Sequence, residues 1–139
     1  MTDYNLQRFL YAQQGDYEQA LAEVSNGRKY SHWIGYIFPQ LKGLGMSYNS
    51  QYYGISGKGE AEAYLAHPVF GERLREITSV FLQLKNKTAQ AVFGSLDAMK
   101  VLLCMTLFNE VASDDLFQQV IDRYYQGIAD EATKRKLEK

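Results

Sequence analysis

Seven of the chain's 11 glycines fall between positions 27 and 59, in a segment with no helical or strand periodicity. The segments on either side repeat apolar residues every three or four positions, which is the pattern of amphipathic helices. A stretch of roughly 30 residues without regular structure is uncommon inside a compact domain and is usually functional when it is ordered. We therefore expect a mainly α protein: a single compact helical domain with an irregular Gly/aromatic-rich segment, residues 28–59, packed against it.

The apolar spacing predicts short helices over most of the remaining chain. Helix 96–111 is the most apolar and is expected at the centre, and the first two helices are expected to pack as an antiparallel pair. Within residues 28–59 we expect one helical turn ended by Pro39 and, between Tyr36 and Ile55, a short pair of strands. The helices predicted are 4–13, 17–26, 60–67, 69–85, 89–93, 96–111, 116–126 and one after Asp130. Six of them have a predicted N-terminal cap, which in chain order is Asp3, Asp16, Thr88, Ser95, one of Ser113 to Asp115, and Asp130.

Length and composition limit the protein's class. The 139 residues fit one domain, 1–139. With a net charge of −1, we expect no electrostatic binding to nucleic acid, and we interpret the one basic cluster, Lys134 to Lys136, as a solvated helix end. The single cysteine, Cys104, cannot form an intramolecular disulfide, which indicates a reducing compartment. No signal peptide and no run of about 18 apolar residues is visible, so we expect a cytoplasmic protein that does not contact a membrane.

The stretch KYSHWIGYIFPQLKGLG, residues 29–45, holds the only tryptophan and one of the two histidines. We expect it to fold over helix 96–111 and to leave a cavity between them that solvent can reach. Cations beside aromatic rings suit an anionic, planar ligand such as a nucleotide. The two histidines and one cysteine show no zinc-site spacing, and no Gly-rich phosphate motif occurs, so we predict neither a metal nor a cofactor.

Each candidate site residue has a structural interpretation beside the functional one. His32 either carries protons near neutral pH or is a hydrogen-bonded histidine at the edge of the core. Trp33 either stacks on a ligand or anchors the segment to the body, and Phe38 belongs to the same set of rings. Gln40 either hydrogen-bonds to the polar edge of a ligand's ring or holds a loop in place through hydrogen bonds. Lys29 and Lys100 are candidates to meet a phosphate, with solvation as the alternative for Lys29. Asp97 is the acidic candidate and lies three residues before Lys100, close enough to face it on one helix.

Six short motifs in order resemble a bacterial family, number eighteen-ten of the domain-of-unknown-function series. They are YNLQRFLYAQ, HWIGYIFPQLKGLG, YYGIS, EAEAYLAHPVFGERL, VFGSLDAMK and CMTLF, and they cover nearly the whole chain. The resemblance implies that the chain shares the fold of this family, for which no activity is established. Members are often labelled calpastatin, although nothing in this sequence indicates a protease inhibitor. Members usually read His-Trp-Met-Trp-Phe at positions 32–36 and carry small hydroxyl residues at Leu103 and Cys104, so this chain departs from the family at both places.

The layout is also distantly similar to a helical superfamily of N-glycosidases associated with NAD and ADP-ribose. That similarity favours a nucleotide-like or ribosylated ligand and, if the protein is an enzyme, hydrolysis of an N-glycosidic bond. A carboxylate such as Asp97 or Glu110 would then stabilise the cationic sugar, and His32 would move protons. The alternative is a non-catalytic interaction module, a homodimer whose interface is the aromatic segment.

Overall fold

The computed structural model describes residues 4–138, and all regular structure in that range is helical. No strand forms there. The expected strand pair is reduced to one isolated parallel bridge, between Leu41 and Ile55. The helices are α1 (Gln7–Gln14), α2 (Tyr17–Ser25), α3 (Ile34–Ile37), α4 (Tyr48–Tyr52), α5 (Lys58–Ala66), α6 (Phe70–Gln83), α7 (Ala89–Phe93), α8 (Ser95–Asn109), α9 (Leu116–Tyr124) and α10 (Glu131–Leu137).

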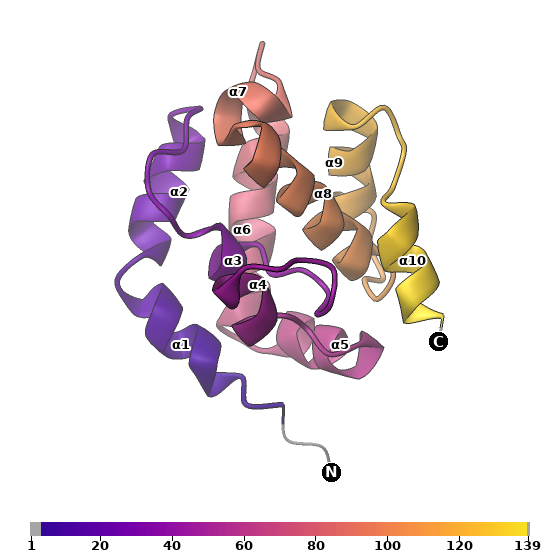
Figure 1. Cartoon of the computed structure of the whole chain (residues 1–139). Helices are drawn as coiled ribbons and strands as arrows, with labels where there is room; N and C mark the ends of the chain where they lie inside the picture. Colours follow the sequence, from indigo (N-terminus) through magenta and orange to yellow (C-terminus); the bar gives the residue numbers. More distant parts are fainter. Residues whose placement is uncertain (1–3, 139) are drawn as a thin grey trace.

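Helix α8 lies at the centre, where it packs against α9, α7, α10, α5 and α3 (Figure 1). Val101, Cys104, Met105 and Phe108 of α8 are all buried in one core. Helix α6 completes that core by packing against α2, α5 and α9. A helix that is apolar on most sides belongs in the interior, because each side then removes hydrocarbon from water. The expectations of a mainly helical fold with helix 96–111 at its centre are confirmed.

The first two helices do not form the expected antiparallel pair. Gly15, between them, keeps a right-handed helical conformation (φ −100°, ψ −9°), so the chain bends without reversing. In Figure 1, α1 and α2 follow one another along one edge of the molecule. Helix α1 packs against α3, whereas α2 packs against α6. The prediction was wrong because a short connection alone does not imply reversal; a turn conformation is also needed.

Two of the expected helix caps form as predicted. The Thr88 hydroxyl accepts a hydrogen bond from the Ala91 backbone N–H at 3.0 Å, and the Asp130 carboxylate accepts one from Thr133 at 2.9 Å. Each satisfies one of the donors that a helix leaves unpaired at its start.

The other caps differ. Ser95 lies inside α8, and Gly94 precedes the helix without a side chain to cap it. Asp16 accepts a hydrogen bond from the Tyr36 hydroxyl. Asp115 makes no capping bond, and its neighbour Asp114 pairs with Arg75. Asp3 lies outside the described residues.

The segment 28–59 is built into the core. Its buried side chains include Trp33, Ile37, Phe38 and Ile55. It contains two short helices, α3 where one turn was predicted and α4, which the sequence did not predict. Ser47 caps the start of α4: its hydroxyl accepts a hydrogen bond from the Ser50 backbone N–H at 3.1 Å. The segment therefore contributes aromatic side chains to the core, and it also carries polar side chains on its outer side.

Candidate functional site

An open trough of about 470 Å³ lies where segment 28–59 meets the first turns of α8. Its floor is α3, through Ile34 and Gly35, because α3 packs against both α4 and α8. One wall comes from α8 and the other from the start of α4, and the trough is completed by side chains that precede α3. The wall and end residues are Leu96, Asp97 and Lys100 of α8, Ser47, Tyr48, Asn49 and Ser50 around α4, and Lys29 and His32.

The α8 wall carries charge. The Lys29 ammonium lies 2.9 Å from Asp97 Oδ2, and the two side chains are only 8% and 18% exposed. The main chain at Lys29 is held by a 2.7 Å hydrogen bond from its N–H to the Val92 carbonyl. Lys100, one turn further along α8, is half-buried and forms no ion pair with any of residues 4–138. This wall therefore presents two lysines: the charge of Lys29 is neutralised by Asp97, and Lys100 has no counter-ion among residues 4–138.

The α4 wall carries no charge. Ser47 and Ser50 hydrogen-bond to each other at 2.8 Å, so their hydroxyls are mostly occupied. Within residues 4–138, no hydrogen bond engages the Tyr48 hydroxyl or the Asn49 amide. Gly35 permits the close approach of this wall, because a Cβ there would lie 3.1 Å from Asn49 Cβ.

Four of the predicted site residues, Lys29, His32, Asp97 and Lys100, line this one trough. His32 is exposed, next to the floor helix. The expected position of the cavity, between the tryptophan-bearing segment and the helix predicted over 96–111, agrees with the trough. The ligand that we expect these side chains to meet remains a prediction.

Trp33 and Phe38 lie elsewhere: each is 1% exposed and belongs to the core. Their rings pack together at 6.2 Å, and both pack against Phe93. No face is left open for a ligand, so the structure supports the anchoring role for Trp33 and corrects the stacking role for both rings. Burial of large apolar rings against one another is the more favourable use of that surface.

Trp33 is oriented by a buried carboxylate. Its indole N–H donates to Glu23 Oε1 at 2.9 Å. The same carboxylate accepts from the Tyr30 and Ser31 backbone N–H groups at 2.8 and 3.0 Å, and from the Ser31 hydroxyl at 2.7 Å. Burial alone would raise the pKa of Glu23, but these hydrogen bonds favour the charged form and lower the pKa to about 2. Glu23 thus holds the turn that leads to His32.

Gln40 is also buried, at 6% exposure. Its backbone carbonyl accepts the Ile55 N–H at 2.9 Å as part of the isolated bridge. Its side-chain amide nitrogen lies close to Gly45, 3.1 Å from where a Cβ of that residue would be, and Gln40 does not line the trough. The structure therefore corrects the expectation that Gln40 reads a ligand, and it favours the loop-tethering alternative.

Comparison with known proteins places the chain in a family. The family described as "Protein of unknown function (DUF1810)" matches residues 3–137. The chain belongs to the DUF1810 family. It is similar to the crystal structure of the conserved hypothetical protein Rv1873 from Mycobacterium tuberculosis, with 38% sequence identity, 98% of each chain covered and a TM-score of 0.96. No match was found among curated proteins. The description of DUF1810 states no activity, so function has to be argued from the trough.

The trough residues of this DUF1810 protein that sequence reasoning missed come mainly from α4. Helix α4 has five residues, too few for a periodic apolar pattern to show. The available signal was Ser47, a favoured residue at a helix start, placed before a tyrosine-rich run.

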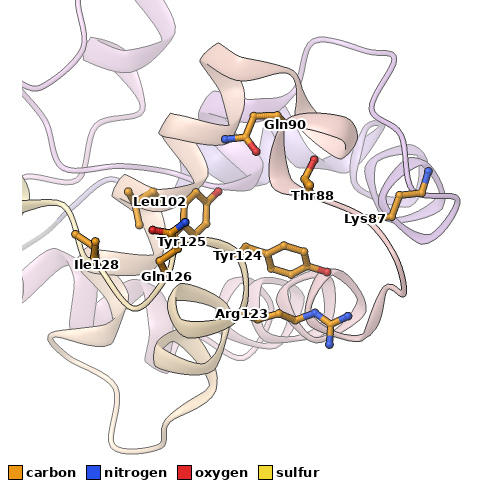
Figure 2. Close-up of a pocket in the computed structure, with 9 residues that line it drawn as sticks. All are labelled: Lys87, Thr88, Gln90, Leu102, Arg123, Tyr124, Tyr125, Gln126 and Ile128. Atoms are coloured by element: carbon orange, nitrogen blue, oxygen red, sulfur yellow. The ribbon is translucent and has the colours of Figure 1, made fainter.

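A second cavity, of about 510 Å³, lies between α7 and the end of α9. Figure 2 shows Thr88 and Gln90 on one side of it and Arg123 and Tyr124 on the other. Three of its polar side chains already serve the fold: Thr88 caps α7, Tyr124 donates to the Phe81 carbonyl at 2.7 Å, and Arg123 donates to the Leu84 carbonyl. Within residues 4–138, the side chains left unengaged are those of Lys87, Gln90 and Gln126 here, and those of His32, Tyr48, Asn49 and Lys100 in the trough. This cavity therefore offers a ligand fewer unengaged groups than the trough.

Residues 4–138 contain no group of three or more His, Cys, Asp or Glu side chains placed to hold a metal ion. Within the same range, no helix combines the length and apolar character needed to cross a bilayer.

Proposed function

We propose that the trough binds a nucleotide-like or ribosylated small molecule. The observation that supports this is the gathering of Lys29, His32, Asp97 and Lys100 around one open trough whose opposite wall is uncharged. Ligand sites are typically concave and hold a few polar groups among apolar ones. Here Ile34 and Leu96 supply apolar surface, while Tyr48 and Asn49 have hydrogen-bonding capacity left for sugar hydroxyls or a base edge.

The fixed carboxylate supports a hydrolytic version of this function. Lys29 pairs with Asp97 and keeps the carboxylate in one place. A carboxylate beside the anomeric carbon stabilises the positive charge that develops as an N-glycosidic bond breaks. In that reaction water adds its oxygen to the anomeric carbon and loses a proton while the bond to the base breaks. Adenine leaving adenosine takes up a proton on a ring nitrogen, whereas the cationic nicotinamide ring of NAD leaves as the neutral base and needs none. His32, which lines the trough, would accept the proton from water and, for adenosine, deliver one to the base.

Ligand binding is tested by thermal shift and by fluorescence of Trp33, with NAD, ADP-ribose, AMP and adenosine as probes. Trp33 is buried, but its ring lies 5.1 Å from the Lys29 ammonium, so a ligand that perturbs Lys29 also changes the indole emission. Binding to the native state raises Tm. Lys100→Gln should reduce the shift caused by the phosphorylated probes NAD, ADP-ribose and AMP, whereas Lys87→Gln in the second cavity should leave every shift unchanged.

No shift from any probe at millimolar concentration would contradict the proposed binding function. Hydrolysis is assayed separately, by release of nicotinamide from NAD or of adenine from adenosine. The Asp97→Asn protein, which keeps the shape of the side chain, should release much less base, because it lacks the carboxylate. Binding without release of nicotinamide or adenine would support the binding function and contradict the hydrolytic one.

A second candidate is a homodimer that uses the rim of the trough. Tyr48 and Leu96 line the trough, Met46 and Met99 are adjacent in sequence to trough residues, and all four are more than half exposed. Tyrosine and methionine are enriched at interfaces. Light scattering after size exclusion distinguishes the two candidates: a dimer that dissociates in Leu96→Lys and ignores every probe favours the interface, and a monomer that binds a probe favours the trough.

A further inference from the structure

The two walls of the trough differ in charge, and this difference determines how a ligand can lie in it. All charged trough residues except Lys29 belong to α8, and the α4 wall contributes hydroxyls, an amide and a ring. We infer, resting on the proposed function above, that the ligand is phosphorylated and lies with its phosphate on Lys100 and its planar ring on Tyr48. The proposal thus assigns one recognition residue to each wall.

Lys100 is the better anion partner of the two lysines. Lys29 already has Asp97 as a counter-ion at 2.9 Å, in a pair whose side chains are mostly buried. Breaking such a pair would leave an uncompensated charge in a poorly solvated place, which is costly. Lys100 has no counter-ion within residues 4–138 and is half-buried, so an anion can reach it and is only partly screened by water. A phosphate there would complete the charge balance of the α8 wall.

Tyr48 is positioned to receive a planar ring. Its side chain is 74% exposed, yet its ring stacks on Tyr52 with 7° between the planes and 5.7 Å between the centroids. Tyr52 in turn packs edge-on against Tyr53 at 4.8 Å, and Tyr53 reaches Phe9 in the core. This series of rings holds Tyr48 in place, so little side-chain freedom is lost when a base stacks on its open face.

Asn49 supports the same orientation. Its amide has no hydrogen bond within residues 4–138, and its Cβ is held against Gly35 on the floor. An amide both donates and accepts, as a ribose hydroxyl pair or a base edge requires. The sugar would then lie over α3, between the phosphate on α8 and the base on α4.

The experiment measures Kd for AMP, adenosine and ribose 5-phosphate by calorimetry on the full chain. Lys100→Gln should weaken AMP and ribose 5-phosphate about ten-fold and leave adenosine unchanged, because only the charged hydrogen bond is lost. Tyr48→Ala should weaken AMP and adenosine by about five- to ten-fold and leave ribose 5-phosphate unchanged. Tyr48→Phe, which keeps the ring, should bind the base-containing ligands almost as well as the wild type.

Lys85→Gln and Tyr11→Ala are the matched controls, because both residues are exposed and lie outside the trough. Thermal melts verify that each variant is folded. If the wild type binds the probes but Lys100→Gln weakens adenosine as much as AMP, or Tyr48→Ala weakens none of them, the inferred orientation is wrong and the binding function stands. If the wild type binds none of the three, the binding function fails, and the orientation fails with it.

Discussion

At the scale of single residues, Glu23 has the most influence on the site without being part of it. Its carboxylate gathers the Tyr30 and Ser31 backbone and the Trp33 indole into one turn. That turn sets the direction in which the chain passes His32 and enters α3. A buried carboxylate is tolerated there because each of its oxygens is hydrogen-bonded.

Glu23→Gln should therefore destabilise the protein by about 2 kcal/mol at pH 7, because an amide cannot accept all four hydrogen bonds. The pKa of Glu23 is lowered from 4.5 to about 2, so its contribution is fully present above pH 4.5 and is lost as pH falls towards 2. Urea unfolding at several pH values measures this. The wild type should lose more stability than the variant between pH 4.5 and 2.

Glu18→Gln is the control, because Glu18 is an exposed residue of the same helix. Equal acid sensitivity in wild type and Glu23→Gln would contradict the assigned role of the carboxylate.

The identity of a residue does not reveal whether it is buried. The unusual residues of segment 28–59 could be recognised from the sequence, and Lys29 and His32 do line the trough. Trp33 and Phe38 could equally face a ligand or the core, since the same apolar ring favours both. What decides their place is Phe93, a ring distant in sequence that packs on both. Such a contact cannot be read from local spacing.

At the scale of elements, periodicity predicted the long helices, and the Thr88 cap marked the short helix α7, but α4 was missed. Helices α6 and α8, of 14 and 15 residues, show their apolar pattern over several turns. Helix α4 is only five residues long and is stabilised by the Ser47 cap and its ring contacts. The order of α1 and α2 in space depends on the backbone at Gly15, which the sequence leaves open because glycine permits either a bend or a reversal.

Helices α5 and α6 approach each other closely at Gly71. A Cβ at this position would overlap the backbone carbonyl of Leu65, and backbone cannot move aside as a side chain can. Gly71→Ala should therefore cost about 3 kcal/mol or more. Gly15→Ala is the matched change, since nothing lies within 4 Å of its Cβ and its conformation suits alanine. It should be neutral or stabilise by about 0.5 kcal/mol. Thermal unfolding of both variants provides the comparison.

The helix caps give a second test at this scale. Asp130→Ala removes an acceptor from Thr133 and should destabilise the protein by about 1 kcal/mol. Asp115→Ala, at the start of α9, should cost clearly less, because Asp115 makes no capping bond and, among residues 4–138, its carboxylate accepts a hydrogen bond from Gln119 alone. Urea midpoints of the two variants should differ in that order; equal losses would show that sequence position alone sets the effect.

At the scale of the whole molecule, Cys104 reports on global unfolding. It is fully buried in the central helix, and burial raises the pKa of its thiol. The native protein should therefore react with a thiol reagent only after the core opens. The labelling rate should rise with urea in step with the unfolding equilibrium, and a ligand of the trough should slow it. Fast labelling under native conditions would show that α8 opens locally.

The arrangement of the trough has a mechanical consequence. Helix α4 packs against α3 alone among the principal helix contacts, and a helix of five residues has little stability of its own. A molecule bound across the trough would contact both α4 and α8 and would stabilise α4. The backbone N–H groups of Tyr48–Tyr52 would then exchange with deuterium far more slowly than in the protein without ligand.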